Sequence, residues 1–336
     1  MKKTLAWMLA LAPSLGFASS AAAADPMTLQ LKWVTQAQFA GYYVAQAKGF
    51  YKAEGLDVTI KPGGPDINPS QVIAAGGADV IVDWMPDALA AREKGVKLVN
   101  IAQVFQKSGM ELTCRKDSGV TSPADFKGKT LGVWFSGNQY PFLAWMGKLG
   151  LTTSGANPDV TVLKQGFNVD PLLQKQAACI STMNYNEYWQ VIEGGLKPAD
   201  LVVFKYQDEG VAMLEDGLYT TDAELADPKK AADLAKFVKA TMEGWSYAAA
   251  HQAEAVQIVM SFDTAGVLDA AHQAKMMASV ATLLTDGKDK NGYLDQAAYQ
   301  RTVDVLMEDK TASVITKQPE GAYTHKIYDA AYGVKG

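Results

Sequence analysis

Aromatic side chains and hydrogen-bonding side chains occur together in four short segments of this chain, residues 33–39, 83–86, 136–139 and 184–188. Indole and phenol rings can stack on a flat ligand, while carboxylates, amides and hydroxyls can pair with its donors and acceptors. These residue types predict a site for a small, flat, polar molecule. The residues expected to contact it are Trp33, Gln36, Gln38, Tyr42, Asp83, Trp84, Ser136, Gly137, Asn138, Asn184, Tyr185 and Glu187.

The charges of these segments favour a neutral or amino-bearing ring over an anion. Asp83 and Glu187 can each accept hydrogen bonds from an amino group. Sulfonates and carboxylates are usually bound by arginine or by backbone amides at a helix start, and none of the four segments contains arginine. Gly137 and its neighbours could still offer backbone amides to an anion. We therefore expect a heteroaromatic compound rather than an alkyl sulfonate.

The sequence shows little that is typical of catalysis or metal binding. His251, His272 and His325 fall in the C-terminal part, where we expect them away from the binding segments and, for the first two, on helix surfaces. No nucleophile elbow, Walker loop or zinc-binding pair occurs. Cys114 and Cys179 lack metal-ligand spacing, and either a disulfide or two separate thiols is consistent with the sequence. We expect no catalytic residue, no cofactor and no metal.

Strand and helix patterns alternate along the first two thirds of the chain. Short apolar runs of the kind buried in parallel sheets predict strands at residues 29–33, 56–60, 80–82, 98–104, 111–115, 130–135, 160–163 and 178–183. Helices are expected between them, and the chain from Asp227-Pro228 onward is expected to be mainly helical. This order is typical of an α/β fold. Because ligands of open α/β sheets bind beyond the carboxyl ends of strands, the four segments should meet at a cleft.

The length of the chain predicts two lobes, since 336 residues exceed what one compact core normally holds. We expect residues 25–106 to form the first lobe and residues 107–223 the second. A C-terminal helical part, residues 224–336, should complete the first lobe. Two crossings, near residues 105–110 and 205–225, would join the lobes, with two of the binding segments on each side of the cleft.

The N-terminus has the features of a secretory signal peptide, residues 1–24. Two lysines precede an apolar run at residues 5–17, and three alanines ending at Ala24 offer a cleavage site. The run is shorter than the roughly 20 residues that span a bilayer, and no cysteine follows the site for a lipid anchor. Cleavage would leave 29 basic and 36 acidic side chains, a net charge of −7. This balance argues against a nucleic-acid partner and favours a free periplasmic protein.

Three stretches of the chain resemble a known family. They are Leu31-Lys32-Trp33-Val34-Thr35-Gln36-Ala37-Gln38-Phe39-Ala40-Gly41-Tyr42-Tyr43-Val44-Ala45, Lys48-Gly49-Phe50-Tyr51-Lys52-Ala53-Glu54-Gly55-Leu56-Asp57-Val58 and Ser122-Pro123-Ala124-Asp125-Phe126-Lys127-Gly128-Lys129-Thr130-Leu131-Gly132-Val133. They resemble the solute-binding proteins of ABC importers, in the family that includes sulfonate, thiamine-pyrimidine and riboflavin binders. The resemblance implies a two-lobed α/β fold, the type II periplasmic-binding-protein fold, with the ligand cleft between the lobes.

The same resemblance implies a function in transport. A monomer would capture a small molecule in the periplasm and deliver it to ABC permease subunits at the inner membrane. We favour a thiamine pyrimidine precursor as the ligand, with a sulfonate, taurine or riboflavin as alternatives. A ligand-sensing module that docks to a receptor would show the same cleft and the same binding, and the sequence does not separate these two roles.

The family resemblance also includes an enzyme. Thiamine pyrimidine synthases share the fold and carry a lysine that holds pyridoxal phosphate, a nearby histidine and a cysteine-rich run. Alignment through residues 77–82 places the lysine position on Asp83 and the histidine position on Asp87, and the cysteine run has no counterpart near residues 209–218. An aspartate cannot form the Schiff base. We therefore expect a binding protein rather than an enzyme.

Overall fold

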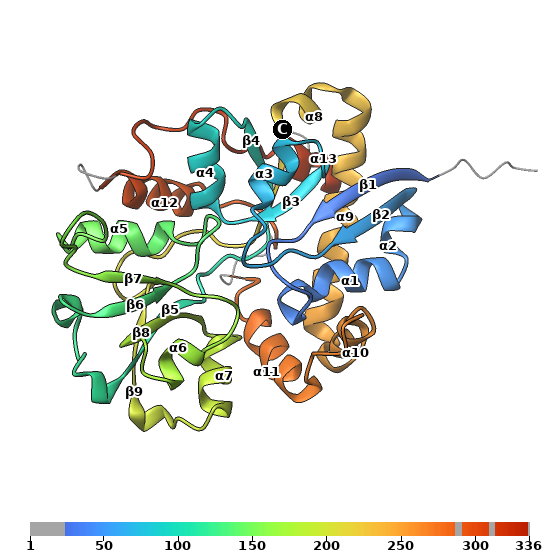
Figure 1. Cartoon of the computed structure of the whole chain (residues 1–336). Coiled ribbons are helices and arrows are strands. Elements are labelled where there is room, and N and C mark those ends of the chain that lie inside the picture. Colours follow the sequence, from blue (N-terminus) through green and yellow to red (C-terminus); the bar gives the residue numbers. More distant parts are fainter. Residues whose placement is uncertain (1–23, 286–290, 309–312, 335–336) are drawn as a thin grey trace, which may run out of the picture.

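The computed structural model describes residues 24–285, 291–308 and 313–334. All but the last residue of the expected signal peptide lies outside these ranges. Two five-stranded sheets with their helices form two lobes, with the second lobe, mostly green, at the left of Figure 1 and the first, mostly blue, at the right. The two-lobed α/β architecture expected from the sequence is confirmed. Within the described ranges, no helix is both long enough and apolar enough to cross a membrane.

The first sheet has the strand order β2-β1-β3-β10-β4. Its strands are β1 (Asp25–Gln30), β2 (Leu56–Lys61), β3 (Val80–Asp83), β4 (Leu98–Gln103) and β10 (Gly217–Thr221). The first three are parallel, and β10 lies antiparallel between β3 and β4. Every side chain of β3 and β4 is buried, including the polar Asp83, Asn100 and Gln103, which is typical of strands covered on both faces. Strand β1 ends before Trp33, which had been expected inside it and instead lies in the loop that follows.

The second sheet has the same plan, with the order β7-β6-β8-β5-β9. Its strands are β5 (Met110–Arg115), β6 (Thr130–Val133), β7 (Thr161–Lys164), β8 (Cys179–Met183) and β9 (Leu201–Lys205). Strand β6 is parallel to β7 and β8, whereas β5 is antiparallel to β8 and β9. In each sheet, the antiparallel strand is the one that the chain enters directly after crossing from the other lobe.

The chain crosses between the sheets through residues 104–109 and 206–216, close to the expected positions. Strand β10 follows the second crossing and pairs within the first sheet. The sequence had assigned residues 107–223 to the second lobe, so that boundary extends one strand too far. The reason is that β10 is specified by its pairing with β3 and β4, which are distant in sequence.

Seven helices lie between the strands, together with short turns such as η1 (Ala37–Phe39). They are α1 (Ala40–Ala47), α2 (Phe50–Ala53), α3 (Pro69–Ala74), α4 (Met85–Glu93), α5 (Tyr140–Lys148), α6 (Asp170–Leu173) and α7 (Glu187–Glu193). Glycine ends α1 as expected, because Gly49 has φ +76°, a left-handed conformation that glycine adopts without strain.

The C-terminal part of the chain is helical, as expected. It contains α8 (Asp222–Ala226), α9 (Pro228–Ala250), α10 (Gln252–Ser261), α11 (Ala270–Ala281), α12 (Gln296–Glu308) and α13 (Lys326–Tyr332). Asp227 caps α9 by accepting hydrogen bonds from the backbone N–H groups of Lys229 and Lys230. Helix α9 packs on α1 and α13, while α12 packs on both α4 and α5. The C-terminal part therefore covers the first sheet and also reaches the second lobe.

Helices α1 and α9 cross at two glycines. A Cβ atom on Gly244 would lie 2.2 Å from the carbonyl oxygen of Gly41, and a Cβ atom on Gly41 would lie 2.2 Å from the ring of Trp245. The close approach brings Trp245 edge-on to Tyr42, with ring centres 5.4 Å apart. Tyr42 is fully buried in this contact. The loop that precedes α1 is therefore anchored to the core of the first lobe.

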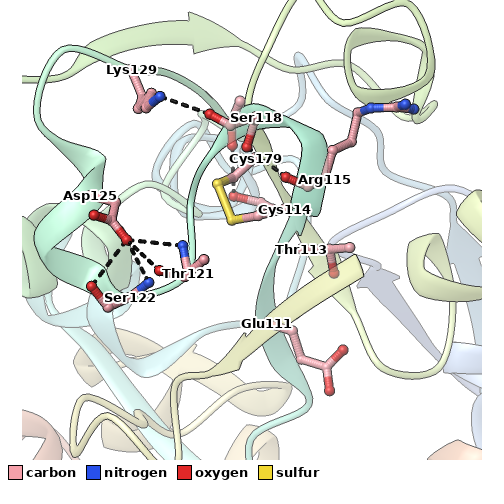
Figure 2. Close-up of a disulfide and its surroundings, with 12 residues drawn as sticks. Glu111, Thr113, Cys114, Arg115, Ser118, Thr121, Ser122, Asp125, Lys129 and Cys179 are labelled. Atoms are coloured by element: carbon pink, nitrogen blue, oxygen red, sulfur yellow. Dashed lines mark hydrogen bonds between the residues drawn. A yellow bond between two sulfur atoms is a disulfide. The ribbon is translucent and has the colours of Figure 1, made fainter. Parts of the chain in front are cut away.

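Cys114 and Cys179 form a disulfide in the second lobe (Figure 2). They lie directly opposite each other on β5 and β8, and both are fully buried. The sequence left this pairing open because the two cysteines are 65 residues apart, and only the strand order brings them together. Figure 2 also shows Asp125 accepting hydrogen bonds from Thr121 and Ser122, which stabilises the turn before β6.

Candidate functional site

A pocket lies between the two lobes, where loops at the ends of strands from both sheets meet. It contains about 310 Å³ of empty space, part of it open to solvent. Seven of the twelve residues predicted from the sequence line it. The complete lining is Lys32, Trp33, Gln36, Gln38, Trp84, Trp134, Asn138, Met183, Tyr185, Asn186 and Glu187.

Aromatic rings provide flat walls on both sides of the pocket. Trp33 of the first lobe and Trp134 of the second lie edge to face, with ring centres 6.2 Å apart. Trp84 is held by a hydrogen bond of 2.8 Å from its indole Nε1 to Asp216. Tyr185 is buried on the side of the second lobe. Rings placed in this way can enclose a flat ligand from two sides.

A chain of hydrogen bonds connects the polar residues of the two lobes. Asp216 accepts from Gln38 Nε2 at 2.8 Å, and Gln38 Oε1 accepts from Gln36 Nε2 at 2.7 Å. Asn186 of the second lobe donates from Nδ2 to Gln36 at 3.4 Å and to Glu187 at 2.8 Å. Burial raises the pKa of Asp216 to about 6, although its hydrogen bonds oppose this shift. The polar wall of the pocket is therefore a connected network that includes two carboxyl groups.

Glu187 begins helix α7 and brings a buried carboxyl group to the pocket. Its Oε2 accepts a hydrogen bond from the backbone N–H of Met183 at 3.0 Å, and its Oε1 accepts one from Asn186. Burial raises the pKa of Glu187 to about 7, with the Met183 N–H acting in the opposite direction. Each oxygen keeps a second lone pair. Glu187 can therefore accept hydrogen bonds from N–H groups of a ligand in a desolvated environment.

Lys32 lines the pocket and was not predicted. It follows β1, is almost fully buried, and forms an ion pair of 2.5 Å with Asp83. Its ammonium group lies 5.4 Å from the centre of the Trp84 ring, a cation–π contact. Burial acts to lower the pKa of Lys32, but the carboxyl groups of Asp83 and Asp87 outweigh it, and the pKa lies above its ordinary value. Lys32 is therefore a cation whose charge Asp83 already balances.

Asp83 and Tyr42 were expected to contact a ligand, but neither lines the pocket. Asp83 is fully buried, and besides Lys32 it accepts hydrogen bonds from Ser70 Oγ at 2.7 Å and from the backbone N–H of Trp84 at 2.8 Å. Tyr42 points into the core of the first lobe. Asp83 thus supports the pocket from behind by holding Lys32 and the start of α4.

Ser136, Gly137 and Asn184 also lie outside the pocket lining. Ser136 Oγ donates to the carbonyl oxygen of Pro65 in the first lobe at 2.8 Å. Gly137 has φ +98°, and a Cβ atom there would lie 2.1 Å from Cγ of Asp87, so only glycine fits. This turn joins the lobes and faces a carboxyl group, which does not suit an anion cradle. Asn184 lines a separate, wider groove beside the two crossings.

His272 contradicts the expectation that the histidines lie on surfaces away from the binding segments. Helix α11 carries it to the second lobe, where Nε2 lies 2.8 Å from Asn186 Oδ1 and Nδ1 lies 2.9 Å from Glu193 Oε2. The side chain is buried. His251, by contrast, is exposed as expected. The contact of His272 depends on how the lobes close, which no local sequence pattern shows.

Trp134, Met183 and Asn186 line the pocket as well, although they were not chosen from the sequence. Strand β6 ends at Val133 and β8 ends at Met183, so all three follow the rule that placed the other candidates at strand ends. Trp134 was missed because its strand was expected to continue to residue 135. Lys32 had no such signal, since lysine is rarely buried.

The buried carboxyl groups make the stability of the ligand-free protein depend on pH. Burial raises the pKa of Asp87 and of Glu215 to about 8 and that of Glu187 to about 7. In the unfolded chain these groups release their protons near pH 4, so the folded state binds more protons between the two values. We expect the free energy of unfolding to fall by more than about 2 kcal/mol between pH 5 and pH 8.5.

Urea denaturation at a series of pH values measures this dependence. The double variant Asp87→Asn, Glu215→Gln should show a flatter profile, because its amides do not titrate. A free energy of unfolding that stays constant or rises from pH 5 to pH 8.5 would contradict the assignment.

Comparisons with known proteins identify relatives of this chain. A model of the family described as NMT1/THI5 like matches residues 36–255. The formylaminopyrimidine-binding protein of Halalkalibacterium halodurans is 25% identical over 246 residues, which cover 73% of this chain and 72% of that protein. The riboflavin-binding protein RibY of Chloroflexus aurantiacus is 26% identical over 245 residues, covering 70% of this chain and 66% of that protein.

A solved structure supports the fold. The periplasmic aliphatic sulphonate binding protein SsuA of Escherichia coli superposes with a TM-score of 0.63 at 13% identity, covering 85% of this chain and 88% of that chain. This likeness confirms the two-lobed periplasmic-binding-protein fold. The family match extends over more than half of the residues, from the first binding segment to α10. The chain belongs to the NMT1/THI5-like family.

Proposed function

We propose that this protein is the solute-binding component of an ABC importer and that it captures an amino-substituted heteroaromatic compound, of the thiamine pyrimidine precursor type, in the periplasm. The observation that carries the proposal is the pocket between the lobes, which is lined by tryptophans of both lobes and by the buried carboxyl group of Glu187. The name of the formylaminopyrimidine-binding relative supports the same ligand class. Permease subunits at the inner membrane are the proposed partners.

The hydrogen-bonding groups of the pocket favour a ligand that donates. Glu187 has lone pairs left to accept hydrogen bonds, and Asn138 Oδ1, buried in the same pocket, has no hydrogen-bond partner among the described residues. Unfilled buried acceptors are costly, and the N–H groups of an aminopyrimidine would fill them. The aromatic walls would cover the faces of the ring.

An alkyl sulfonate fits this pocket less well. The pocket lining contains no arginine, and Lys32, its cation, is already paired with Asp83. A sulfonate would approach the carboxyl group of Glu187, and like charges repel. Riboflavin remains a second candidate, supported by the name of one relative. Its three fused rings and ribityl chain need more space between the lobes than a single pyrimidine ring does.

The residues do not fit a synthase that uses pyridoxal phosphate. The position of the cofactor lysine is Asp83, and the nearby Lys32 stays protonated because carboxyl groups surround it, whereas a Schiff base needs a neutral amine. No histidine is among the residues that line the pocket. We therefore propose binding without turnover.

The conformation suits a protein that closes around its ligand. Two contacts join the lobes: Lys164 of the second lobe pairs with Asp66 of the first at 2.8 Å, and Ser136 Oγ donates to the carbonyl oxygen of the neighbouring Pro65. A ligand that contacts both lobes binds the closed form more tightly and shifts the population toward it. The closed form would then be the one delivered to the permease.

A thermal-shift screen of the purified protein tests the proposal. We expect formylaminopyrimidine to raise the melting temperature, because a ligand that binds only the folded state stabilises it, while taurine and alkyl sulfonates should leave it unchanged. A shift with sulfonates alone, or turnover of a pyrimidine precursor in the presence of pyridoxal phosphate, would contradict the proposal. A shift with riboflavin alone would favour the second candidate.

A further inference from the structure

A histidine links the two lobes beside the pocket, through its contact with the lining residue Asn186. Helix α11, orange in Figure 1, lies beside α7 of the second lobe. His272 on α11 is buried, and both of its ring nitrogens face oxygen atoms of the second lobe. Nε2 lies 2.8 Å from Asn186 Oδ1, and Nδ1 lies 2.9 Å from Glu193 Oε2. Both contacts are broken when the lobes separate.

The hydrogen bonds of Asn186 determine which atom faces His272. Its Nδ2 donates to the carboxyl group of Glu187 at 2.8 Å, so its Oδ1 points to α11. The same Oδ1 also accepts a hydrogen bond from Gln190 Nε2 at 3.1 Å. An amide oxygen can only accept. The Nε2 atom of His272 must therefore carry a hydrogen and donate it.

The second ring nitrogen also faces an acceptor. Glu193 is partly exposed and pairs with Lys275 Nζ at 2.8 Å, and both features favour an ionised carboxylate independently of His272. A carboxylate only accepts hydrogen bonds, and Nδ1 must therefore donate. With both nitrogens protonated, His272 is an imidazolium cation in the closed arrangement.

We propose that His272 is a positioning residue of the ligand pocket: as a cation it joins the lobes and holds Asn186, which in turn holds Glu187 in its ligand-accepting orientation. The inference rests on the proposed function. It adds that closure around the ligand is coupled to a proton on His272. Because both acceptors of the imidazolium belong to the second lobe, closure favours the protonated ring. Lower pH should therefore favour the closed, ligand-bound form through this residue.

The charged groups near His272 lie on α7, on its own helix α11 and on the neighbouring α10. In the part of the chain that the structure describes, Glu193 of α7 is the charged group that contacts the ring. On the same helix as His272, Lys275 pairs with Glu193 at 2.8 Å and Asp269 caps the backbone N–H of His272. On the neighbouring α10, Glu254 is engaged with Lys48 of the first lobe. Lys275 thus shares Glu193 with His272 but does not contact Asn186, which makes it a matched control.

Calorimetric affinities for formylaminopyrimidine at pH 6 and pH 8.5 test the inference. We expect His272→Gln to bind about tenfold more weakly than the wild type at pH 6, the effect of one lost charged hydrogen bond, and this ratio to be smaller at pH 8.5, because higher pH disfavours an imidazolium. Glu187 titrates in both proteins, so the ratio between them isolates His272. Lys275→Gln should stay within about twofold of the wild type at both values, as exposed ion pairs contribute little.

Two results would overturn the inference. A ratio near one at pH 6 would show that His272 does not support binding. A loss of affinity that is equal at both pH values would show that its role is packing alone.

Hydrogen exchange of the ligand-free protein separates this inference from the proposed function. If the wild type does not bind formylaminopyrimidine, the proposed function fails, and exchange still decides the role of His272. The backbone N–H of Met183 bonds to Glu187, and that of Asn186 bonds to the carbonyl oxygen of Met183. At pH 6, His272→Gln should lower the protection of these amides about tenfold, and Lys275→Gln should not. Unchanged protection in His272→Gln would contradict the positioning role.

Discussion

Replacing Glu187 with glutamine is expected to weaken the binding of formylaminopyrimidine about 10- to 150-fold, the effect of losing a hydrogen bond to a charged group. Both oxygens of Glu187 accept hydrogen bonds inside the protein, one from Met183 N–H and one from Asn186 Nδ2. In the variant, an amide nitrogen would replace one of these two oxygens. It would then face a hydrogen-bond donor of the protein, and the pocket would lose one acceptor. Calorimetry at pH 8, above the pKa of about 7, measures the effect on the ionised form.

A second buried glutamate provides the control for this variant. Glu111 also lies in the second lobe, is 6% exposed, and has its pKa raised to about 7 by burial. It does not line the pocket between the lobes. Glu111→Gln should therefore change the affinity by less than about twofold. If Glu187→Gln binds as tightly as Glu111→Gln, then Glu187 does not contact the ligand.

Replacing Lys32 with methionine is expected to lower the free energy of unfolding by about 3–5 kcal/mol, the usual cost of leaving a buried charge without its partner. Asp83 would remain fully buried with only Ser70 and the backbone of Trp84 as hydrogen-bond donors. Urea denaturation at pH 8 measures the change in the ligand-free protein.

The double variant Lys32→Met, Asp83→Leu distinguishes the ion pair from simple packing. Removing both charges removes the desolvation cost as well, so the double variant should be more stable than Lys32→Met alone. A double variant that loses the sum of the two single losses would show that the pair is not energetically coupled.

The strand-end rule found much of the candidate pocket from the sequence. Trp33, Trp84, Asn138 and Glu187 all follow or border a strand of their lobe, and all line the pocket. The rule works because the carboxyl ends of parallel strands gather their loops at one edge of a sheet. It does not require knowledge of the packing.

Contacts between distant segments could not be predicted in the same way. Asp83 has the residue type of a ligand acceptor, but Lys32 occupies it, and no sequence pattern shows that a lysine will be buried. His272 reaches the pocket only because α11 packs against the second lobe. The Cys114–Cys179 disulfide depends on the pairing of β5 with β8. Each of these features is set by tertiary structure.

The measurement that tests the central claim most directly compares two ligands in calorimetric titrations at pH 8. One is formylaminopyrimidine, and the other is the same molecule with a methyl group in place of the ring amino group. The account predicts that one molecule of formylaminopyrimidine binds per chain. The methyl compound should bind at least about tenfold more weakly, because Glu187 no longer receives a hydrogen bond from the ring amino group. Equal affinities for the two compounds, or binding of an alkyl sulfonate in place of both, would contradict it.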